Sequence, residues 1–334
     1  MIDKYTNFFE YHSGIKARPY DIVSLGNQPK DAILTIIITT YNRGGILKES
    51  LNSALNQNTN FPYKVLLIDN CSSPSLVTTT DFIAEYAEKN VTIVKNRENY
   101  GMYGNSNQGA AIADTEYIAF LHDDDIFRDD FVEEIIPLLK DNPQISALHV
   151  GVTKFQGDKY LTPLIENRIL KKVKAYEALF HTQGAPTGFV IKKEMFVKFG
   201  GYNECYHPTC DYCFSVLLAN CANYYTYSRT LCYYRVEYND SLKVETLAHF
   251  VTNDFYLRRC VLRRYHIPHL FSDLFLSYDT PRHVRWLKKA YNSEFEFDSN
   301  KALGIETLPS RLGYIIARIY ISLHISLYRI FLKM

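Results

Sequence analysis

The chain of 334 residues has almost no net charge and no apolar run near its start, and each of these two features excludes a class of protein. It contains one Trp, and its Lys and Arg residues outnumber Asp and Glu only by 37 to 36. Because the net charge is close to zero, no overall positive field attracts a nucleic acid backbone, and we expect no nucleic acid partner. The first six residues, Met1–Thr6, lead into no apolar run that a signal peptidase could recognise, which favours a cytoplasmic protein.

The cysteines do not indicate a disulfide framework, because seven is an odd number. Cys205, Cys210, Cys213 and Cys221 lie close together with His207 among them, in a superficial zinc-binding pattern. A four-ligand structural zinc site normally shows two closely spaced pairs, and only Cys210 and Cys213 have that gap. We therefore interpret the cysteines as buried free thiols in a reducing compartment, with zinc as the alternative.

The remaining composition, 47% apolar and 22% charged, is that of an ordinary globular chain. The length indicates roughly two domains. We divide the chain into an N-terminal extension over 1–30, a central domain over 31–240 and a helical region over 241–334. We divide the central domain further into two halves, 31–125 and 126–240. The first half is expected to bind one reactant, and the second half is expected to bind the other.

Short β-branched runs alternate with helical periodicity from residue 33 onward. Strands are expected at 33–38, 63–68, 91–94 and 117–121, and helices at 46–55, 76–89, 129–140 and, after a loop that begins at residue 101, up to 113. This alternation predicts an α/β fold with a mostly parallel sheet flanked by helices and joined by right-handed crossovers.

Polar residues follow each of the four predicted strands. They are Thr39 to Asn42, Asp69 and Asn70, Asn96 to Gly101, and His122 to Asp125. Ligands of such sheets bind beyond the carboxyl ends of the strands, so we expect these residues to converge in one crevice.

Three consecutive carboxylates, Asp123, Asp124 and Asp125, directly follow the fourth predicted strand. Like charges this close raise one another's pKa values unless a cation is present. Mg²⁺ and Mn²⁺ bind carboxylate oxygens together with a substrate's phosphates, so the triplet predicts a metal–diphosphate site. The alternative is the N-terminus of the next helix, a role for which Asp129 and Asp130 are better placed.

These segments resemble the successive motifs of the family 2 glycosyltransferases, which have the GT-A fold. The matching segments are Ile38-Thr-Thr-Tyr-Asn42, Leu67-Ile-Asp-Asn70, Asn99-Tyr-Gly101 with Asn107 and Gly109, and Phe120-Leu-His-Asp-Asp-Asp125. The resemblance runs in order from about Ile33 to Arg235. It implies a GT-A-like sheet and the inverting transfer of a sugar from a nucleotide diphosphate, most often UDP, to an acceptor hydroxyl, with Mn²⁺ or Mg²⁺ as the cofactor.

The resemblance also implies roles for single residues. Asp69 and Thr39 would hold the nucleoside, Asp123 would lie near the ribose, and Asp124 would be the main metal ligand. The other donor-binding residues that it implies are Tyr41, Asn42, Asn99, Gly101 and Arg235. His122 departs from the pattern, since many relatives have an acidic residue there. This leaves Asp124 with Asp123 or Asp125 to hold the ion, and His122 as either a ligand or a spacer.

A general base is expected in the second half of the domain. In the resembled family, a turn like Gly200–Tyr202 precedes an acidic residue that takes the proton from the acceptor hydroxyl. Asp211 is the matching residue, and Glu204 is the second candidate. The structural alternative for Asp211 is a helix N-cap. Arg235, in a segment with Asn239 and Ser241, would either pair with the donor diphosphate or lie on the surface.

The last segment, 311–334, has the pattern of an amphipathic helix. Its polar residues form one narrow stripe and are Arg311, Arg318, Ser322, Ser326, Arg329 and Lys333. A membrane-spanning helix would bury arginines at about 2.5–3.5 kcal/mol each. We therefore expect peripheral membrane contact, with packing on the protein or in a homo-oligomer as the alternative. Membrane contact would make a lipid-linked saccharide of bacterial surface polysaccharide the acceptor, on the cytoplasmic face of the inner membrane.

Two other functions stay open on the sequence alone. A sugar-nucleotide nucleotidyltransferase shares the sheet and the metal site, but it needs a Gly-rich basic loop after the first strand, and Arg43–Gly45 is short for that role. A non-catalytic protein that binds nucleotide or carbohydrate is the other alternative. Selectivity for a particular sugar, acceptor or linkage depends on loop shape, so no motif specifies it.

Overall fold

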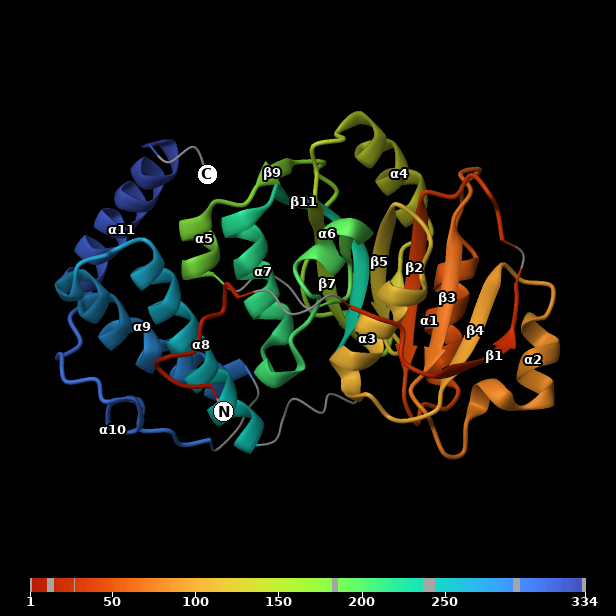
Figure 1. Cartoon of the computed structure of the whole chain (residues 1–334), viewed down its shortest axis with the longest axis horizontal. Helices are drawn as coiled ribbons and strands as arrows, with labels where there is room; N and C mark the ends of the chain where they lie inside the picture. The colour runs from red at the N-terminus through yellow and green to blue at the C-terminus, as the bar shows by residue number, and fades with distance from the viewer. Residues whose placement is uncertain are drawn as a thin grey trace.

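The fold is built on one mixed sheet of 11 strands, flanked by helices on both faces (Figure 1). The computed structural model describes residues 2–10, 15–26, 28–181, 186–236, 244–290 and 295–331. The strands are β1 Tyr20–Ser24, β2 Leu34–Thr40, β3 Lys64–Asp69, β4 Val91–Asn96, β5 Tyr117–His122, β6 Ile126–Phe127, β7 Ala147–Gln156, β8 Lys159–Tyr160, β9 Leu170–Lys172, β10 Phe189–Lys192 and β11 Tyr224–Arg235. The helices are α1 Ile46–Leu55, α2 Thr80–Tyr86, α3 Gly101–Ile112, α4 Phe131–Asp141, α5 Ala175–Phe180, α6 Lys193–Lys198, α7 Cys210–Cys221, α8 Val244–Arg264, α9 His269–Ala290, α10 Ser299–Leu303 and α11 Arg311–Phe331.

The strand order is β1-β4-β3-β2-β5-β10-β7-β11-β6, with β8 paired to β7 and β9 paired to β11. Neighbours among β4, β3, β2 and β5 are parallel, which confirms the α/β fold with a parallel core. Strand β10 pairs antiparallel with both β5 and β7, and β1 pairs antiparallel with β4 at the sheet's edge. The segment 20–24, which lies in the predicted N-terminal extension, therefore belongs to the sheet.

The β-branched composition of β2 follows from burial on both faces of the sheet. Ile36, Ile37 and Ile38 are all 0% exposed, because side chains alternate between two apolar clusters. Ile37 packs in the cluster that includes α3 and α7, whereas Ile36 and Ile38 pack with α1 and α4. Gly109 on α3 allows that helix to lie close to the sheet, since a Cβ there would be 2.4 Å from Ile37 Cγ2.

Two predicted boundaries were wrong. The helix expected over 76–89 is a 3₁₀ turn at 76–78 followed by α2, because the Thr79 hydroxyl accepts the Phe82 N–H at 3.3 Å and caps the helix there. The loop expected at the start of 101–113 is absent, since α3 begins at Gly101, whose N–H donates to Asn99 Oδ1 at 2.8 Å.

The cysteines are only partly as predicted. All seven are free, and Cys210, Cys213, Cys232 and Cys260 are buried, but Cys205 is exposed and two others are half-buried. Burial raises the pKa of Cys210 and of Cys213. Among the described residues, the cysteines and His207 form no cluster of three or more metal-ligating side chains, so the zinc alternative gains no support.

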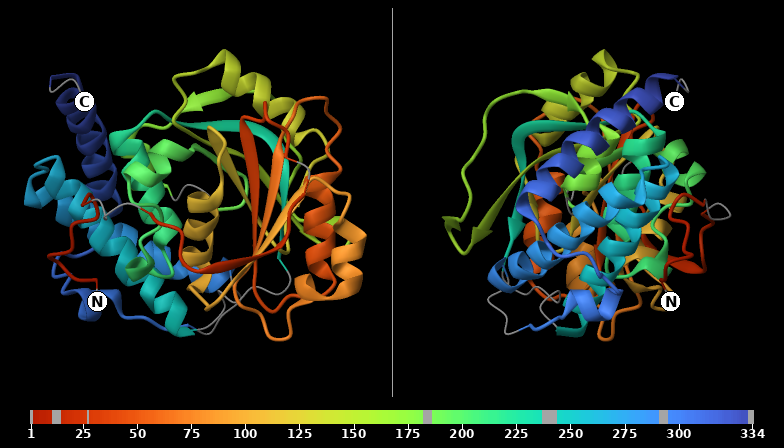
Figure 2. Two further views of the ribbon diagram at one scale, coloured as in Figure 1. Left: turned by 45° about the vertical axis from the view of Figure 1, so that its right-hand side comes forward. Right: turned by 90° about the vertical axis from the view of Figure 1, so that its left-hand side faces the viewer.

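The last third of the chain forms a helical region stacked beside the sheet, with α11 at its periphery (Figures 1 and 2). Helix α11 packs on α9 and on α5. Tyr314, Ala317, Ile321 and Ile325 are its buried residues. In the described part of the chain, every helix is too short or too polar to cross a membrane.

Candidate active site

The loops after β2, β3 and β5 meet at the carboxyl edge of the sheet. Tyr41 N–H donates to Asp123 Oδ2 at 3.4 Å, although the Tyr41 side chain is exposed. Asn42 N–H donates to Ser72 Oγ at 2.8 Å, and Asn42 Oδ1 accepts the Ser73 N–H at 3.0 Å. The loop after β2 thus touches the loops of both neighbouring strands, and Tyr41, Asn42 and Asp123 lie together at this edge.

An asparagine network positions the loop after β4. Asn70 Nδ2 donates to Asn99 Oδ1 at 2.8 Å and to the Gly101 carbonyl at 3.2 Å. Asn70 Oδ1 accepts the Asn96 amide at 3.1 Å and the Tyr100 N–H at 2.9 Å. Asn99 and Gly101 are therefore held against the end of β3 by an amide whose donors and acceptor all have partners.

Asp69 is buried at the end of β3, with 1% of its surface exposed. Its Oδ1 accepts the Ser72 N–H at 3.1 Å and the Ser72 hydroxyl, and its Oδ2 accepts the Ser75 hydroxyl. The carboxylate thereby fixes the loop that contacts Asn42. Thr39 lies across from His122 in the parallel register of β2 with β5. The nucleoside-binding roles of Asp69 and Thr39 stay predictions.

Arg43 faces the acidic residues, and sequence reasoning gave it no role. Its Nε lies 3.1 Å from Asp123 Oδ1, and its Nη2 lies 3.0 Å from Asp124 Oδ2. Burial raises the pKa of Asp123, and the positive charge of Arg43 opposes that rise. The one available signal was that Arg43 follows Asn42 on the loop at the mouth of the sheet.

His122, Asp124 and Asp125 form a compact group whose ligand atoms all lie within 4.8 Å of one another. Asp125 is 0% exposed and accepts the Arg235 N–H at 2.8 Å and the Thr187 hydroxyl at 2.5 Å. Burial raises the pKa of Asp125 to about 6. Two carboxylates and an imidazole fit Mn²⁺, and the carboxylates also fit Mg²⁺. Asp123 lies outside this group and accepts from Tyr41 and Arg43 instead.

Arg235 is buried at the end of β11, which excludes the alternative of a surface arginine. Its Nε donates to the Asp124 carbonyl at 2.8 Å, and its Nη2 pairs with Glu49 at 2.6 Å. The guanidinium also lies 4.5 Å from the centroid of the Phe155 ring. Arg235 therefore anchors the backbone of the acidic cluster. Its pairing with a phosphate stays a prediction, and Asn239 and Ser241 lie outside the described residues.

Asp211 lies in the first turn of α7, half-buried, and it is not the N-cap, which is Thr209. Its Oδ1 accepts the Tyr103 hydroxyl at 2.9 Å, across from α3. Burial raises the pKa of Asp211, while the Tyr103 hydrogen bond and the nearby charge of His122 lower it.

The second candidate base, Glu204, has a different environment. Its carboxylate pairs with Arg18 at 2.5 Å, and both side chains are more than a third exposed. Thr187 is a site residue that the sequence did not reveal. It is fully buried, accepts the His122 N–H at 3.1 Å and donates to Asp125.

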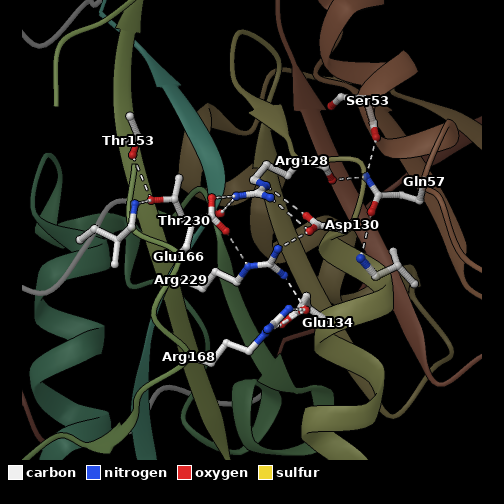
Figure 3. A network of polar contacts seen from close by, with 12 residues as sticks. Ser53, Gln57, Arg128, Asp130, Glu134, Thr153, Glu166, Arg168, Arg229 and Thr230 are labelled. Atoms are coloured by element: carbon white, nitrogen blue, oxygen red, sulfur yellow. Dashed lines mark hydrogen bonds and ion pairs between the residues drawn. The ribbon is translucent and has the colours of Figure 1, made fainter. Parts of the chain in front are cut away.

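An ion-pair network braces the segment that follows the acidic cluster (Figure 3). Arg229 on β11 pairs with Asp130 at 2.7 Å and with Glu134 at 2.5 Å, and Arg128 pairs with Glu166 at 2.6 Å. Asp130 is the N-cap residue of α4, but its carboxylate binds arginines and makes no side-chain cap. Together these ion pairs hold α4 and the segment that follows β6 against β11 and its neighbouring loop.

Solved structures share this fold. The S. aureus TarS 1-349 structure has a TM-score of 0.53 at 13% identity, over 79% of this chain and 93% of that one. The mannosyltransferase PcManGT from Pyrobaculum calidifontis, in complex with GDP-Man and Mn²⁺, has a TM-score of 0.52 at 14% identity, over 95% of this chain and 92% of that one. TarS 1-349 has also been solved in complex with UDP-GlcNAc.

Sequence relatives are also glycosyltransferases by name. An uncharacterized glycosyltransferase of Haemophilus influenzae is 29% identical over 189 residues, which span 56% of this chain and 62% of that protein. The chondroitin synthase of Pasteurella multocida is 28% identical over 151 residues, or 41% of this chain and 15% of that protein. The model of the family named Glycosyl transferase family 2 matches residues 35–200. The chain therefore carries a glycosyltransferase domain of the GT-A type, which is similar to glycosyl transferase family 2 over residues 35–200.

Proposed function

We propose that the protein is a metal-dependent, inverting glycosyltransferase that moves a sugar from a UDP-sugar to a hydroxyl of a saccharide acceptor. The acceptor is lipid-linked and belongs to surface polysaccharide assembly on the cytoplasmic face of the membrane. One observation supports this function above the others: two carboxylates and an imidazole, those of Asp124, Asp125 and His122, form a compact group whose ligand atoms all lie within 4.8 Å of one another, at the end of β5 on the carboxyl edge of the sheet.

Asp211 acts as the general base. A sugar hydroxyl is a poor nucleophile until a base takes its proton as the new bond to the anomeric carbon forms. Burial raises the pKa of Asp211, and a higher pKa makes a carboxylate a stronger proton acceptor. Tyr103 fixes the position of Oδ1, so the other oxygen, Oδ2, is the one that receives the proton from the acceptor.

His122, Asp124 and Asp125 hold the cation, and Arg235 keeps the backbone of that group in place. When bound, Mn²⁺ or Mg²⁺ supplies positive charge that stabilises the departing diphosphate. The donor lies across the loops after β2, β3 and β4, where Asn42, Asn99 and Gly101 are already fixed. The complexes of TarS with UDP-GlcNAc and of PcManGT with GDP-Man and Mn²⁺ support a nucleotide-sugar donor.

The test of the base is the Asp211→Asn substitution, with Asp273→Asn on the exposed surface of α9 as the matched control. Removing a general base lowers the rate by about 10²–10⁴-fold. We expect Asp211→Asn to abolish transfer while UDP affinity, measured by calorimetry, stays nearly unchanged. Normal turnover in the Asp211→Asn protein would refute the assignment, as would an equal loss in Asp273→Asn.

The donor is tested by thermal shift with UDP- and GDP-sugars, each with and without Mn²⁺. We expect stabilisation by UDP-sugars that depends on Mn²⁺ and is lost in Asp124→Asn. Stabilisation by GDP-sugars alone would contradict the UDP assignment, and stabilisation that EDTA leaves unchanged would contradict the metal dependence.

A further inference from the structure

Helix α11 presents an apolar face to solvent, opposite the side on which it packs. Leu323 is 61% exposed and Ile319 is 58% exposed, and the face continues along the whole helix. Its other members are Leu312, Ile315, Ile316, Leu327, Ile330 and Phe331. Exposed apolar patches of this continuity mark interaction surfaces.

Two arginines of the polar stripe, Arg318 and Arg329, contact the protein body and do not lie on this apolar face. Arg329 donates to the Asn220 carbonyl at 2.9 Å, and the guanidinium of Arg318 lies 4.3 Å from the centroid of the Phe180 ring. The polar side chains therefore flank the packed side, and the residues of the exposed face are all apolar. The amphipathic pattern of the sequence thus points its apolar side outward.

The face is wider than the seam of a helix pair. With 3.6 residues per turn, its seven members from Leu312 to Ile330 spread over roughly 120° of the helix circumference. A coiled-coil seam uses only two positions in seven, a narrower stripe. A broad apolar face suits a surface into which the helix can sink along its length.

Charge around the face is complementary to an anionic surface. Residues 244–334 contain 13 Lys and Arg against 8 Asp and Glu, and no acidic residue follows Glu306. A cavity of about 320 Å³ borders the polar stripe of α11 and is lined by Lys171, His181, Arg318 and Ser322, with Glu177 paired to Lys171. Burial lowers the pKa of His181, and the charge of Arg318 lowers it further, as expected of a positive potential.

The chain's one Trp lies on α9, the helix against which α11 packs. Trp286 on α9 is 57% exposed, one turn beyond Arg282, whose guanidinium lies 5.7 Å from the centroid of the Tyr314 ring on α11. Trp is enriched at the boundary between lipid and water.

From these observations we propose that α11 docks the protein onto an anionic lipid bilayer, with its apolar face at the level of the acyl chains and the Lys171–Arg318 cavity beside the lipid phosphates. The proposal is independent of the chemistry at the sheet edge, because none of its residues lies in the candidate active site.

The test is co-sedimentation of the full chain with vesicles of phosphatidylcholine and phosphatidylglycerol at 7:3, compared with vesicles of phosphatidylcholine alone. The triple variant Ile319→Gln/Leu323→Gln/Leu327→Gln removes the centre of the face. Its matched control, Leu161→Gln/Leu164→Gln/Ile169→Gln, makes the same change at apolar residues that are also exposed, in the segment between β8 and β9. The fluorescence of Trp286 gives a second readout.

We expect wild-type protein to bind anionic vesicles with a blue shift of Trp286, and to bind phosphatidylcholine at least tenfold more weakly. The triple variant should lose at least tenfold in partitioning, the control should stay within twofold, and Arg318→Gln should weaken binding to anionic vesicles only. Equal binding by wild type and triple variant, or no binding by wild type, would overturn the proposal. A wild-type dimer that the triple variant dissociates, with no vesicle binding, would also overturn it and would assign the face to self-association.

Discussion

The hydrogen bond from Tyr103 to Asp211 gives a quantitative test of the base. Tyr103 is 4% exposed, and its hydroxyl lies 2.9 Å from Asp211 Oδ1 and 3.0 Å from the Pro208 carbonyl. A hydrogen bond to a charged group contributes about 1.5–3 kcal/mol, and about 1.4 kcal/mol corresponds to one pH unit in a pKa. Because the single O–H is shared with Pro208, we expect the lower end of that range.

Tyr103→Phe removes a donor that stabilises the ionised carboxylate, so the pKa of Asp211 should rise. The base must be ionised to act, and its loss of activity as pH falls should therefore begin about one pH unit higher in the variant. The assay is kcat/KM for transfer against pH, at saturating Mn²⁺, where the acid limb reports the free enzyme's base.

Tyr202→Phe is the matched control, because Tyr202 is also buried and its ring centroid lies 5.3 Å from that of Tyr103. In the described part of the chain, the Tyr202 hydroxyl makes no hydrogen bond to Asp211. An acid limb that stays in place in Tyr103→Phe would refute the reasoning. An equal movement in Tyr202→Phe would show that general loosening of the core, not the hydrogen bond, moves the limb.

Three further predictions follow from single contacts. Arg43→Gln should lower the half-saturating Mn²⁺ concentration in a thermal-shift titration by about tenfold, because the Arg43 guanidinium, 3.0 Å from Asp124, competes with the cation. A half-saturating concentration higher than that of the wild type would contradict this prediction. The Arg168 hydrogen bond lowers the pKa of Glu134 from 4.5 to about 2, so the stability that this carboxylate contributes is present above pH 4.5 and is lost as pH falls toward 2. Calorimetry should show that Tm falls more steeply from pH 5 to pH 3 in the wild type than in Glu134→Gln. Parallel curves for the two proteins would refute this prediction. Gly109→Ala should cost about 1–3 kcal/mol in urea unfolding by overpacking, whereas Gly44→Ala, with nothing within 4 Å, should be near neutral; equal costs would exclude the close approach of α3 to the sheet.

The site residues that can be predicted from the sequence are those that directly follow a strand. The acidic triplet was recognisable because it follows an apolar strand, and the strand was recognisable because its residues are buried on both faces. Arg43, Thr187 and Tyr103 escaped notice for a physical reason. Their carboxylate partners lie 80, 62 and 108 residues away in the chain, so only the fold brings them together. Periodicity shows that a helix has two faces, but not which one a neighbouring helix covers.

A series of contacts joins the helical region to α7, the helix that carries the proposed base. Asn253 on α8 donates to Thr209 Oγ1 at 2.9 Å, which fixes the turn before α7. Five residues further along α8, Arg258 is buried and pairs with Asp279 on α9, and Asp279 in turn accepts the Tyr314 hydroxyl of α11 at 2.9 Å. Removing one partner of a buried ion pair costs about 3–5 kcal/mol, so the Arg258–Asp279 pair strongly favours the packing of α8 against α9. If α11 rests on a bilayer, its orientation there sets the direction from which an acceptor anchored in the same bilayer reaches the base.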